Sequence, residues 1–177
     1  MSTDTMENPI ALELAATLEG GRDRLGGPRD LERWLAARGI DGPGLALRLA
    51  DFRELRAAIR SLLLAAVQAR PMPPDAVEAL NAASAAAPTH PALALDRVEV
   101  VETGPVAARV FAALARSAIE IAGGPERDRV RSCPAPGCGR FFLATRRGRR
   151  WCSPACGNRV RVARHHERHR PPPTLRA

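Results

Sequence analysis

The sequence contains no lysine and no tyrosine, and aromatic side chains make up only 3% of its 177 residues. All 27 basic residues are therefore arginines. The absence of lysine excludes a phosphate-loop lysine, Schiff-base chemistry and a lysine general base. Because 45% of the residues are hydrophobic but few are aromatic, a core must be built from leucine, alanine, valine and isoleucine, which favours closely packed helices.

Enzyme motifs and membrane segments are also missing. Before Cys133 the chain has no cysteine and a single histidine, His90, and it contains no Gly-x-Ser-x-Gly, His-Glu-x-x-His or glycine-rich phosphate-loop motif. We therefore predict that the protein is not an enzyme. Residues 1–7 lack the pattern of a secretory signal, and the longest apolar run, residues 62–67, is far shorter than the roughly 20 residues of a membrane helix. These features predict a cytoplasmic protein without a membrane partner.

Charge is distributed unevenly along the chain. The net charge is +8, and residues 126–177 hold 14 arginines and three acidic residues, which leaves residues 1–125 with a net charge of −3. A basic tail on a mildly acidic body favours a polyanion partner, most often nucleic acid and less often a membrane surface. Alternatively, the arginines keep an alanine-rich protein soluble or pair with acidic residues of the first part. Three acidic residues are too few to neutralise 14 arginines, so we favour the external polyanion.

Helical periodicity dominates the first two thirds of the chain. Apolar residues recur at helical spacing most strongly over residues 45–70, and also over 10–18, 30–39, 75–87 and 105–122. We expect Asp30 to cap the second of these helices in the chain and a loop to follow the Gly20-Gly21 pair. Between His90 and Glu102 apolar residues alternate with others, which predicts a small β-hairpin.

All four cysteines lie within 24 residues of the C-terminal third. Cys133 and Cys138 are separated by four residues, Cys152 and Cys156 by three, and 13 residues lie between the pairs. Two close pairs let two turns deliver four thiolates to one ion, and zinc prefers four such ligands in a tetrahedron. We predict one structural zinc ion, because four cysteines leave no coordination position open for catalysis. Three aromatic side chains are expected to shield the site: Phe141, Phe142 and Trp151.

Other interpretations of this cluster stay open from the residues alone. Two disulfides would suit an oxidising compartment, an iron centre usually has cysteine pairs separated by two residues, and four unrelated thiols are a third alternative. His165 and His169 lie four residues apart on a predicted helix, a spacing at which both could reach one metal. Otherwise these histidines and His166 add polar surface beside the arginines.

Arginines surround both cysteine pairs. A basic loop between the pairs contains Arg146, Arg147, Arg149 and Arg150. Arg161, Arg164 and Arg168 recur at spacings of three and four on a helix that begins at Cys156, so they share one stripe. A guanidinium fork can bind phosphate oxygens or the N7 and O6 edge of guanine, so we predict that the loop and the stripe bind nucleic acid.

The cysteine segments resemble the CGNR zinc finger family. The resemblance is carried by Cys133-Pro134-Ala135-Pro136-Gly137-Cys138-Gly139-Arg140-Phe141-Phe142, by Arg150-Trp151-Cys152-Ser153 and by Cys156-Gly157-Asn158-Arg159. Residues 10–39, with Leu31, Trp34 and Leu35, are similar to the ABATE domain that precedes this finger. The resemblance implies a stress-induced bacterial transcription regulator, in which the finger binds DNA and the ABATE domain senses a ligand or partner.

Two residues of the CGNR motif lie in the first turn of the last predicted helix. We expect Asn158 to support the zinc ligands by a hydrogen bond to the backbone of a knuckle, the tight turn that carries a pair of cysteines. Arg159 is expected to contact either DNA or the first domain.

These observations predict an α+β fold that is mainly α with one small β-hairpin. Residues 1–125 are expected to form a helical ABATE-like domain, residues 126–170 a treble-clef-like or ribbon-like zinc finger with a basic C-terminal helix, and residues 171–177 a proline-rich tail. We predict a zinc-dependent DNA-binding transcription regulator, and the sequence does not predict its oligomeric state. One alternative is a zinc-stapled module that docks an acidic protein partner. The other is a small-molecule sensor whose finger serves dimerisation.

Overall fold

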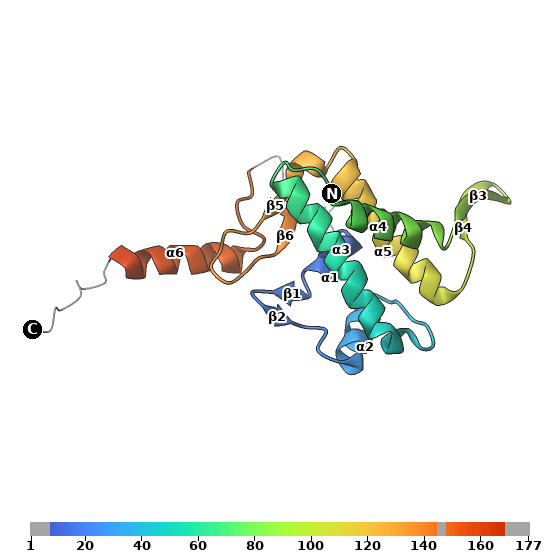
Figure 1. The fold of residues 1–177 in the computed structure, drawn as a ribbon, viewed down its shortest axis with the longest axis horizontal. Coiled ribbons are helices and arrows are strands. Elements are labelled where there is room, and N and C mark those ends of the chain that lie inside the picture. The colour runs from blue at the N-terminus through green and yellow to red at the C-terminus, as the bar shows by residue number, and fades with distance from the viewer. Residues whose placement is uncertain (1–7, 145–147, 169–177) are drawn as a thin grey trace, which may run out of the picture.

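The computed structural model describes residues 8–144 and 148–168, and helices dominate it (Figure 1). The α-helices are α1 (Ile10–Ala15), α2 (Pro28–Ala36), α3 (Leu49–Val67), α4 (Pro74–Ala85), α5 (Val106–Gly123) and α6 (Pro154–Arg168), with 3-10 turns at Leu45–Arg48 and Arg127–Arg129. Three antiparallel hairpins complete the fold: β1 (Leu18–Glu19) with β2 (Arg22–Asp23), β3 (Thr89–Ala94) with β4 (Arg97–Glu102), and β5 (Val130–Ser132) with β6 (Phe141–Leu143). The mainly helical fold with small antiparallel sheets is confirmed. Within the described residues, no helix is both long and apolar enough to cross a membrane.

Helix α3 lies at the centre of the helical core and contacts α1, α4 and α5. Its residues Phe52, Ile59 and Leu63 are fully buried. The rings of Phe52 and Phe111 are 4.7 Å apart between centroids, and Trp34 meets Phe52 edge-on at 6.4 Å. The few aromatic residues of this half are thus concentrated at one point of a core that is otherwise aliphatic.

The start of α2 differs from the sequence prediction. Asp30 was expected to be the N-cap, but the helix begins at Pro28 and Gly27 is the N-cap. Asp30 acts from the third helical position instead, where its carboxylate accepts a hydrogen bond of 3.0 Å from the Gly27 N–H. This is the reciprocal half of a capping box, and the proline at the first position has no N–H that needs a partner.

The β1–β2 hairpin replaces the expected end of the first helix and the loop after it. Helix α1 stops at Ala15, and Gly20 and Gly21, with φ of +57° and +81°, form the turn between the two short strands. Both φ values lie in the left-handed region, which glycine adopts without a steric penalty. The glycine pair was therefore the signal of a hairpin turn, which the helical reading of this segment overlooked.

A buried ion pair fastens this hairpin to α3. The Arg56 side chain is only 6% exposed and donates hydrogen bonds of 2.6 and 2.7 Å to the two carboxylate oxygens of Asp23, and one of 2.9 Å to the Thr17 hydroxyl. The hydrogen bond from Arg56 lowers the pKa of Asp23, even though burial alone would raise it. Arg56 would be costly to bury without this bidentate partner.

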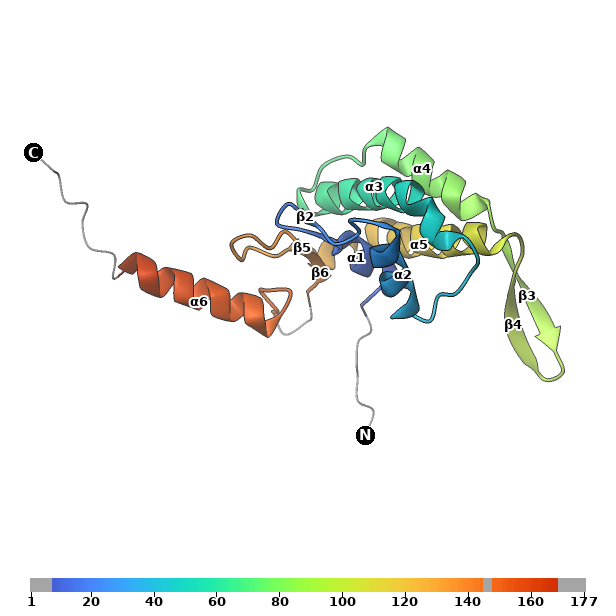
Figure 2. The same ribbon diagram turned by 90° about the horizontal axis from the view of Figure 1, so that it is seen from below.

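The core continues across the boundary predicted near Pro125. Helix α5 ends at Gly123, one residue beyond the expected range 105–122. Val130 of β5 and Phe141 of β6 are nevertheless buried in the same cluster as the helices, and Leu143 packs against it. The β5–β6 hairpin thus roots the C-terminal module in the helical core, while α6 projects away from it (Figures 1 and 2).

Candidate metal centre

The four cysteines meet at one point between the β5–β6 hairpin and the start of α6. All four sulfur atoms lie within 4.8 Å of one another. The distances are 3.5 Å from Cys138 to Cys152, 3.4 Å from Cys152 to Cys156 and 3.7 Å from Cys156 to Cys138. A tetrahedral zinc ion with Zn–S bonds of about 2.3 Å separates its sulfurs by about 3.8 Å. The donor set therefore fits one four-coordinate zinc ion.

The alternatives to a tetrathiolate site find little support in this geometry. All four cysteines are free, and sulfurs 3.4 Å apart are too distant for a disulfide bond of about 2.05 Å. Within the ranges that the structure describes, these cysteines are the only group of three or more potential metal ligands. His165 lies exposed on α6, and His169 falls outside the described residues.

The acidity of the thiols shows why the site needs a cation. In the metal-free chain, burial raises the pKa of Cys138 to about 11 and also raises the pKa of Cys152. The Ser153 hydroxyl lowers the pKa of Cys156 to about 7. Four crowded sulfurs cannot all be thiolates at neutral pH without a compensating positive charge, so metal binding must release protons.

Two glycines shape the turn that carries Cys133 and Cys138, which we call the first knuckle. Gly137 and Gly139 have φ of +69° and +68° on either side of Cys138. The backbone N–H of Cys138 donates to Ala135 O at 3.0 Å, and that of Cys133 donates to Arg140 O at 2.8 Å. The turn thus aims the Cys133 and Cys138 side chains at the same point.

The CGNR segment contributes a ligand and the packing around it. At Gly157 a Cβ atom would lie 3.1 Å from the Trp151 ring, so the glycine lets the indole lie against α6. Arg159 donates to Pro136 O at 3.0 Å and approaches Cys156 Sγ at 3.8 Å, which ties α6 to the first knuckle. The exposed Asn158 accepts a hydrogen bond from Arg161. The contact with the knuckle that we expected of Asn158 is thus made by Arg159.

Two of the three aromatic residues shield the cysteines. Phe142 is 2% exposed and packs in the cysteine cluster together with Trp151. Phe141 was expected to do the same, but adjacent residues of a strand point to opposite faces, and Phe141 enters the helical core. The strand β6 therefore serves the metal site on one face and the helical domain on the other.

Comparison with known families agrees with this architecture. Residues 8–125 match ABATE, a family described as "Putative stress-induced transcription regulator", and residues 129–169 match the CGNR zinc finger. The chain belongs to the ABATE family and carries a CGNR zinc finger. Both families are of regulator or zinc finger type rather than enzyme families. No curated protein matches the sequence.

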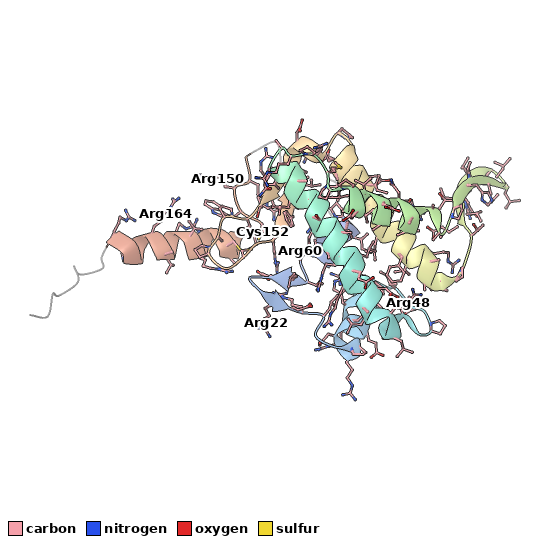
Figure 3. The ribbon with its side chains drawn as sticks, viewed as in Figure 1. Arg22, Arg48, Arg60, Arg150, Cys152 and Arg164 are labelled. Carbon is pink, nitrogen blue, oxygen red and sulfur yellow. The ribbon has the colours of Figure 1, made fainter. Side chains whose placement is uncertain are left out.

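The predicted arginines divide into two groups within the CGNR finger. Arg149 donates hydrogen bonds to the carbonyl oxygens of Trp151 and Cys152, and its guanidinium carbon lies 5.4 Å from the centroid of the Phe142 ring. It therefore supports the turn that carries Cys152 and Cys156, which we call the second knuckle. Arg150 lies over the Trp151 ring and is exposed, and Arg161, Arg164 and Arg168 are exposed along α6. Arg150 and Arg164 are labelled in Figure 3. Arg146 and Arg147 lie outside the described residues.

A contact that the sequence did not predict joins the ABATE domain to the first knuckle. Glu19 of β1 forms an ion pair of 2.7 Å with Arg140, and its other oxygen lies 3.8 Å from Cys138 Sγ. Burial acts to raise the pKa of Glu19, but the hydrogen bond from Arg140 and the charges of Arg140 and Arg24 outweigh it and hold the pKa below its usual value. The Gly20 N–H donates to Cys138 O at 3.0 Å. The tip of the β1–β2 hairpin therefore rests on the backbone of a metal ligand.

Proposed function

We propose that the protein is a zinc-dependent DNA-binding transcription regulator, in which the CGNR finger binds DNA and the ABATE domain responds to a ligand or partner. The observation that supports DNA binding most is the free charge of the finger. Arg150, Arg161, Arg164 and Arg168 are exposed, and none forms an ion pair with a carboxylate whose side chain the structure describes. Exposed guanidinium groups without carboxylate partners are the groups that phosphates bind.

The ABATE domain provides the contrast. Many of its arginines are neutralised, as in the pairs Arg38–Glu13, Arg56–Asp23 and Arg116–Glu102. Its local charge is therefore largely balanced, whereas residues 126–177 contain 14 arginines and only three acidic residues. Such an asymmetry directs a polyanion to the finger.

The shape of the finger suits a DNA groove. Helix α6 has 15 residues and so is about 22 Å long, and most of its described side chains are exposed. The major groove of DNA, about 12 Å wide, admits one α-helix. Zinc, when bound, would hold Cys156 of α6 beside Cys133 and Cys138, which sets the angle at which the stripe leaves the domain. A reducing cytoplasm is part of the proposal, because it keeps the four thiols available for the metal.

The experiment measures how the zinc-loaded full chain binds a labelled duplex of random sequence over a range of salt concentrations. We expect the affinity to fall steeply with salt, as the release of counterions requires. The combined variant Arg161→Ala, Arg164→Ala and Arg168→Ala should reduce the magnitude of the log-log salt slope by up to about 3, one for each lost phosphate contact.

A matched control uses three exposed arginines of the ABATE domain. Arg22→Ala, Arg29→Ala and Arg70→Ala remove the same charge from residues outside the finger. If the control weakens binding as much as the α6 variant, net charge rather than the finger is responsible. Absence of DNA binding at any salt concentration would favour the alternative of an acidic protein partner.

A further inference from the structure

The β3–β4 hairpin is an arm that extends beyond the ends of α4 and α5, at the opposite end of the molecule from α6 (Figures 1 and 2). Its strands have six residues each and pair from Thr89 with Glu102 to Ala94 with Arg97. Six strand residues span about 20 Å. A two-stranded hairpin without a packed face is at best marginally stable in water.

One face of the arm is apolar and open to solvent. Alternation along the register places Pro91 and Leu93 on the same face as their cross-strand partners Val100 and Val98. Leu93 is 79% exposed, Val98 70% and Val100 71%. The other face carries the Arg97–Glu99 ion pair and the half-buried Ala92 and Ala94. The arm thus presents to water the face that a strand pair normally buries.

The tip of the arm shows the same property more strongly. Leu95 is 99% exposed and has a φ of +54°, in the left-handed region where glycine or asparagine is favoured. A hairpin turn with a positive φ at its first central residue normally has glycine there. The chain therefore holds a large apolar side chain at a strained position, fully in water.

A groove that could take such a side chain lies at the base of the arm. Its volume is about 480 Å³, and its floor is apolar, with Leu55, Ala79, Ala83, Ala86, Ala108 and Phe111. Ala86 precedes the arm by three residues, and Pro105, which follows the arm, also lines the groove. Arg48, Asp51 and Glu54 form a charged rim.

We propose that the arm is the dimer interface of the protein, and that two copies pair their arms antiparallel with the apolar faces in contact. In this arrangement the tip of each arm lies at the base of the other, where Leu95 enters the partner's groove. The interface is isologous, because every contact occurs twice about a two-fold axis. It does not depend on the proposed DNA binding.

The positions of the tip and the groove favour a second copy over an unrelated partner. An apolar ribbon alone would fit many partners, but the groove lies one arm length from the tip on the same molecule. Antiparallel pairing of identical arms would place the tip of each arm at the base of the other, beside the groove. The charges also match, since Arg97 lies next to the tip, is 72% exposed although it pairs with Glu99, and can therefore also approach the exposed Glu54 on the rim of the partner's groove.

The first test is the oligomeric state of the zinc-loaded full chain, measured by sedimentation equilibrium over a range of protein concentrations. We expect a dimer for the natural sequence and for Val162→Asp, which changes an exposed apolar residue at the far end, on α6. Leu93→Asp and Leu95→Asp should give monomers with unchanged helical content. A monomeric natural protein at every concentration would overturn the proposal, as would arm variants that remain dimeric.

The second test traps the tip in the groove. One sample carries Leu95→Cys and the other Ala83→Cys, and the two are mixed with zinc bound so that the native cysteines are protected. With a mild oxidant such as oxidised glutathione present to accept the two electrons, a disulfide should form between the two different chains. Much less should form between two Leu95→Cys chains, because antiparallel pairing holds the tips apart. Equal crosslinking in the two cases would contradict the antiparallel arrangement. The absence of any crosslink would also contradict it, and would indicate that the arm binds a partner along the edge of a strand instead.

Discussion

The ABATE domain buries large apolar side chains, whereas the CGNR finger buries mainly its own metal ligands. Phe52, Leu63 and Leu114 are fully buried in a helical core shared by five helices. The buried residues of the second cluster are Ala135, Phe142 and three of the four cysteines. The first region can therefore fold by the hydrophobic effect, whereas the second depends on bonds to an ion. The two regions should respond to different perturbations.

The largest expected effect is removal of the metal. Cys138→Ser leaves three thiolates, and the lost metal-binding free energy, about 10 kcal/mol in isolated zinc fingers, is then no longer available to fold the module. We expect α6 and both knuckles to unfold while α1–α5 remain helical. Metal analysis and amide NMR spectra check this. Chelation of the natural protein should reproduce the result, and a finger that keeps its amide spectrum without metal would contradict it.

The second largest effect is expected from a cavity in the helical core, which should destabilise the ABATE domain and leave the metal site intact. Phe52→Ala removes the ring that contacts both Trp34 and Phe111, and should lower the free energy of unfolding of the ABATE domain by about 3–5 kcal/mol. Below the melting temperature the protein should still bind one zinc ion. Chemical denaturation followed by helical circular dichroism gives the measurement. Leu47→Ala, at a side chain 83% exposed, is the control and should change little.

The third effect concerns the ion pair between Asp23 and Arg56. Asp23→Asn removes the charge opposite a buried guanidinium and should cost roughly 2 kcal/mol, less than for a fully buried pair because the Asp23 side chain is 30% exposed. The pKa of Asp23 is lower in the folded state than its ordinary value of 3.8, so its contribution is complete above that value and is lost as the pH falls through the folded pKa. The difference between the natural protein and the variant should be constant from neutral pH to about pH 5 and shrink below pH 4. Taking the difference cancels the loss of zinc in acid, which is common to both, and a difference that grows on acidification would refute the assignment.

The smallest effect tests the contact that joins the two regions. At Gly20 a Cβ atom would lie 2.2 Å from Gly137 O, whereas at Gly21 it would meet nothing within 4 Å. Both residues have positive φ, so Gly20→Ala and Gly21→Ala should each cost about 1 kcal/mol in backbone strain. Only Gly20→Ala should also push the hairpin off the knuckle and accelerate the transfer of zinc to a chelator several-fold. Equal rates for the two variants would show that the hairpin does not support the site.

Local patterns in the sequence predicted much of this structure. The periodicity over residues 45–70 located α3, although Leu45–Arg48 at its start form a 3-10 turn that was not predicted. The alternation after His90 located the β3–β4 hairpin. The spacing of the cysteines identified the metal site, because both ligand pairs lie within short turns that the sequence determines locally. The helices expected over residues 75–87 and 105–122 correspond to α4 and α5, with ends that differ by one or two residues.

The features that were missed depend on contacts between distant residues. Glu19 and Arg140 are more than 100 residues apart, and neither has a pattern that announces the other. Phe141 and Phe142 are equivalent in the sequence, and only the position of β6 between two cores separates their roles. The contacts of Arg149 with the carbonyl oxygens of Trp151 and Cys152 arise from the folded loop and were not predicted, and its binding of nucleic acid stays a prediction.

The rooting of β5 and β6 in the helical core has a mechanical consequence. Many DNA-binding modules hang on flexible tethers and can reorient freely relative to the rest of the protein. Here Val130 and Phe141 are buried in the helical core and fix the base of the finger, so we expect α6 to keep one orientation relative to the helical domain. If bound DNA tilted α6, the tilt would change the packing around α1 and α3. A rearrangement of α1 and α3 would, in the same way, change the orientation of α6.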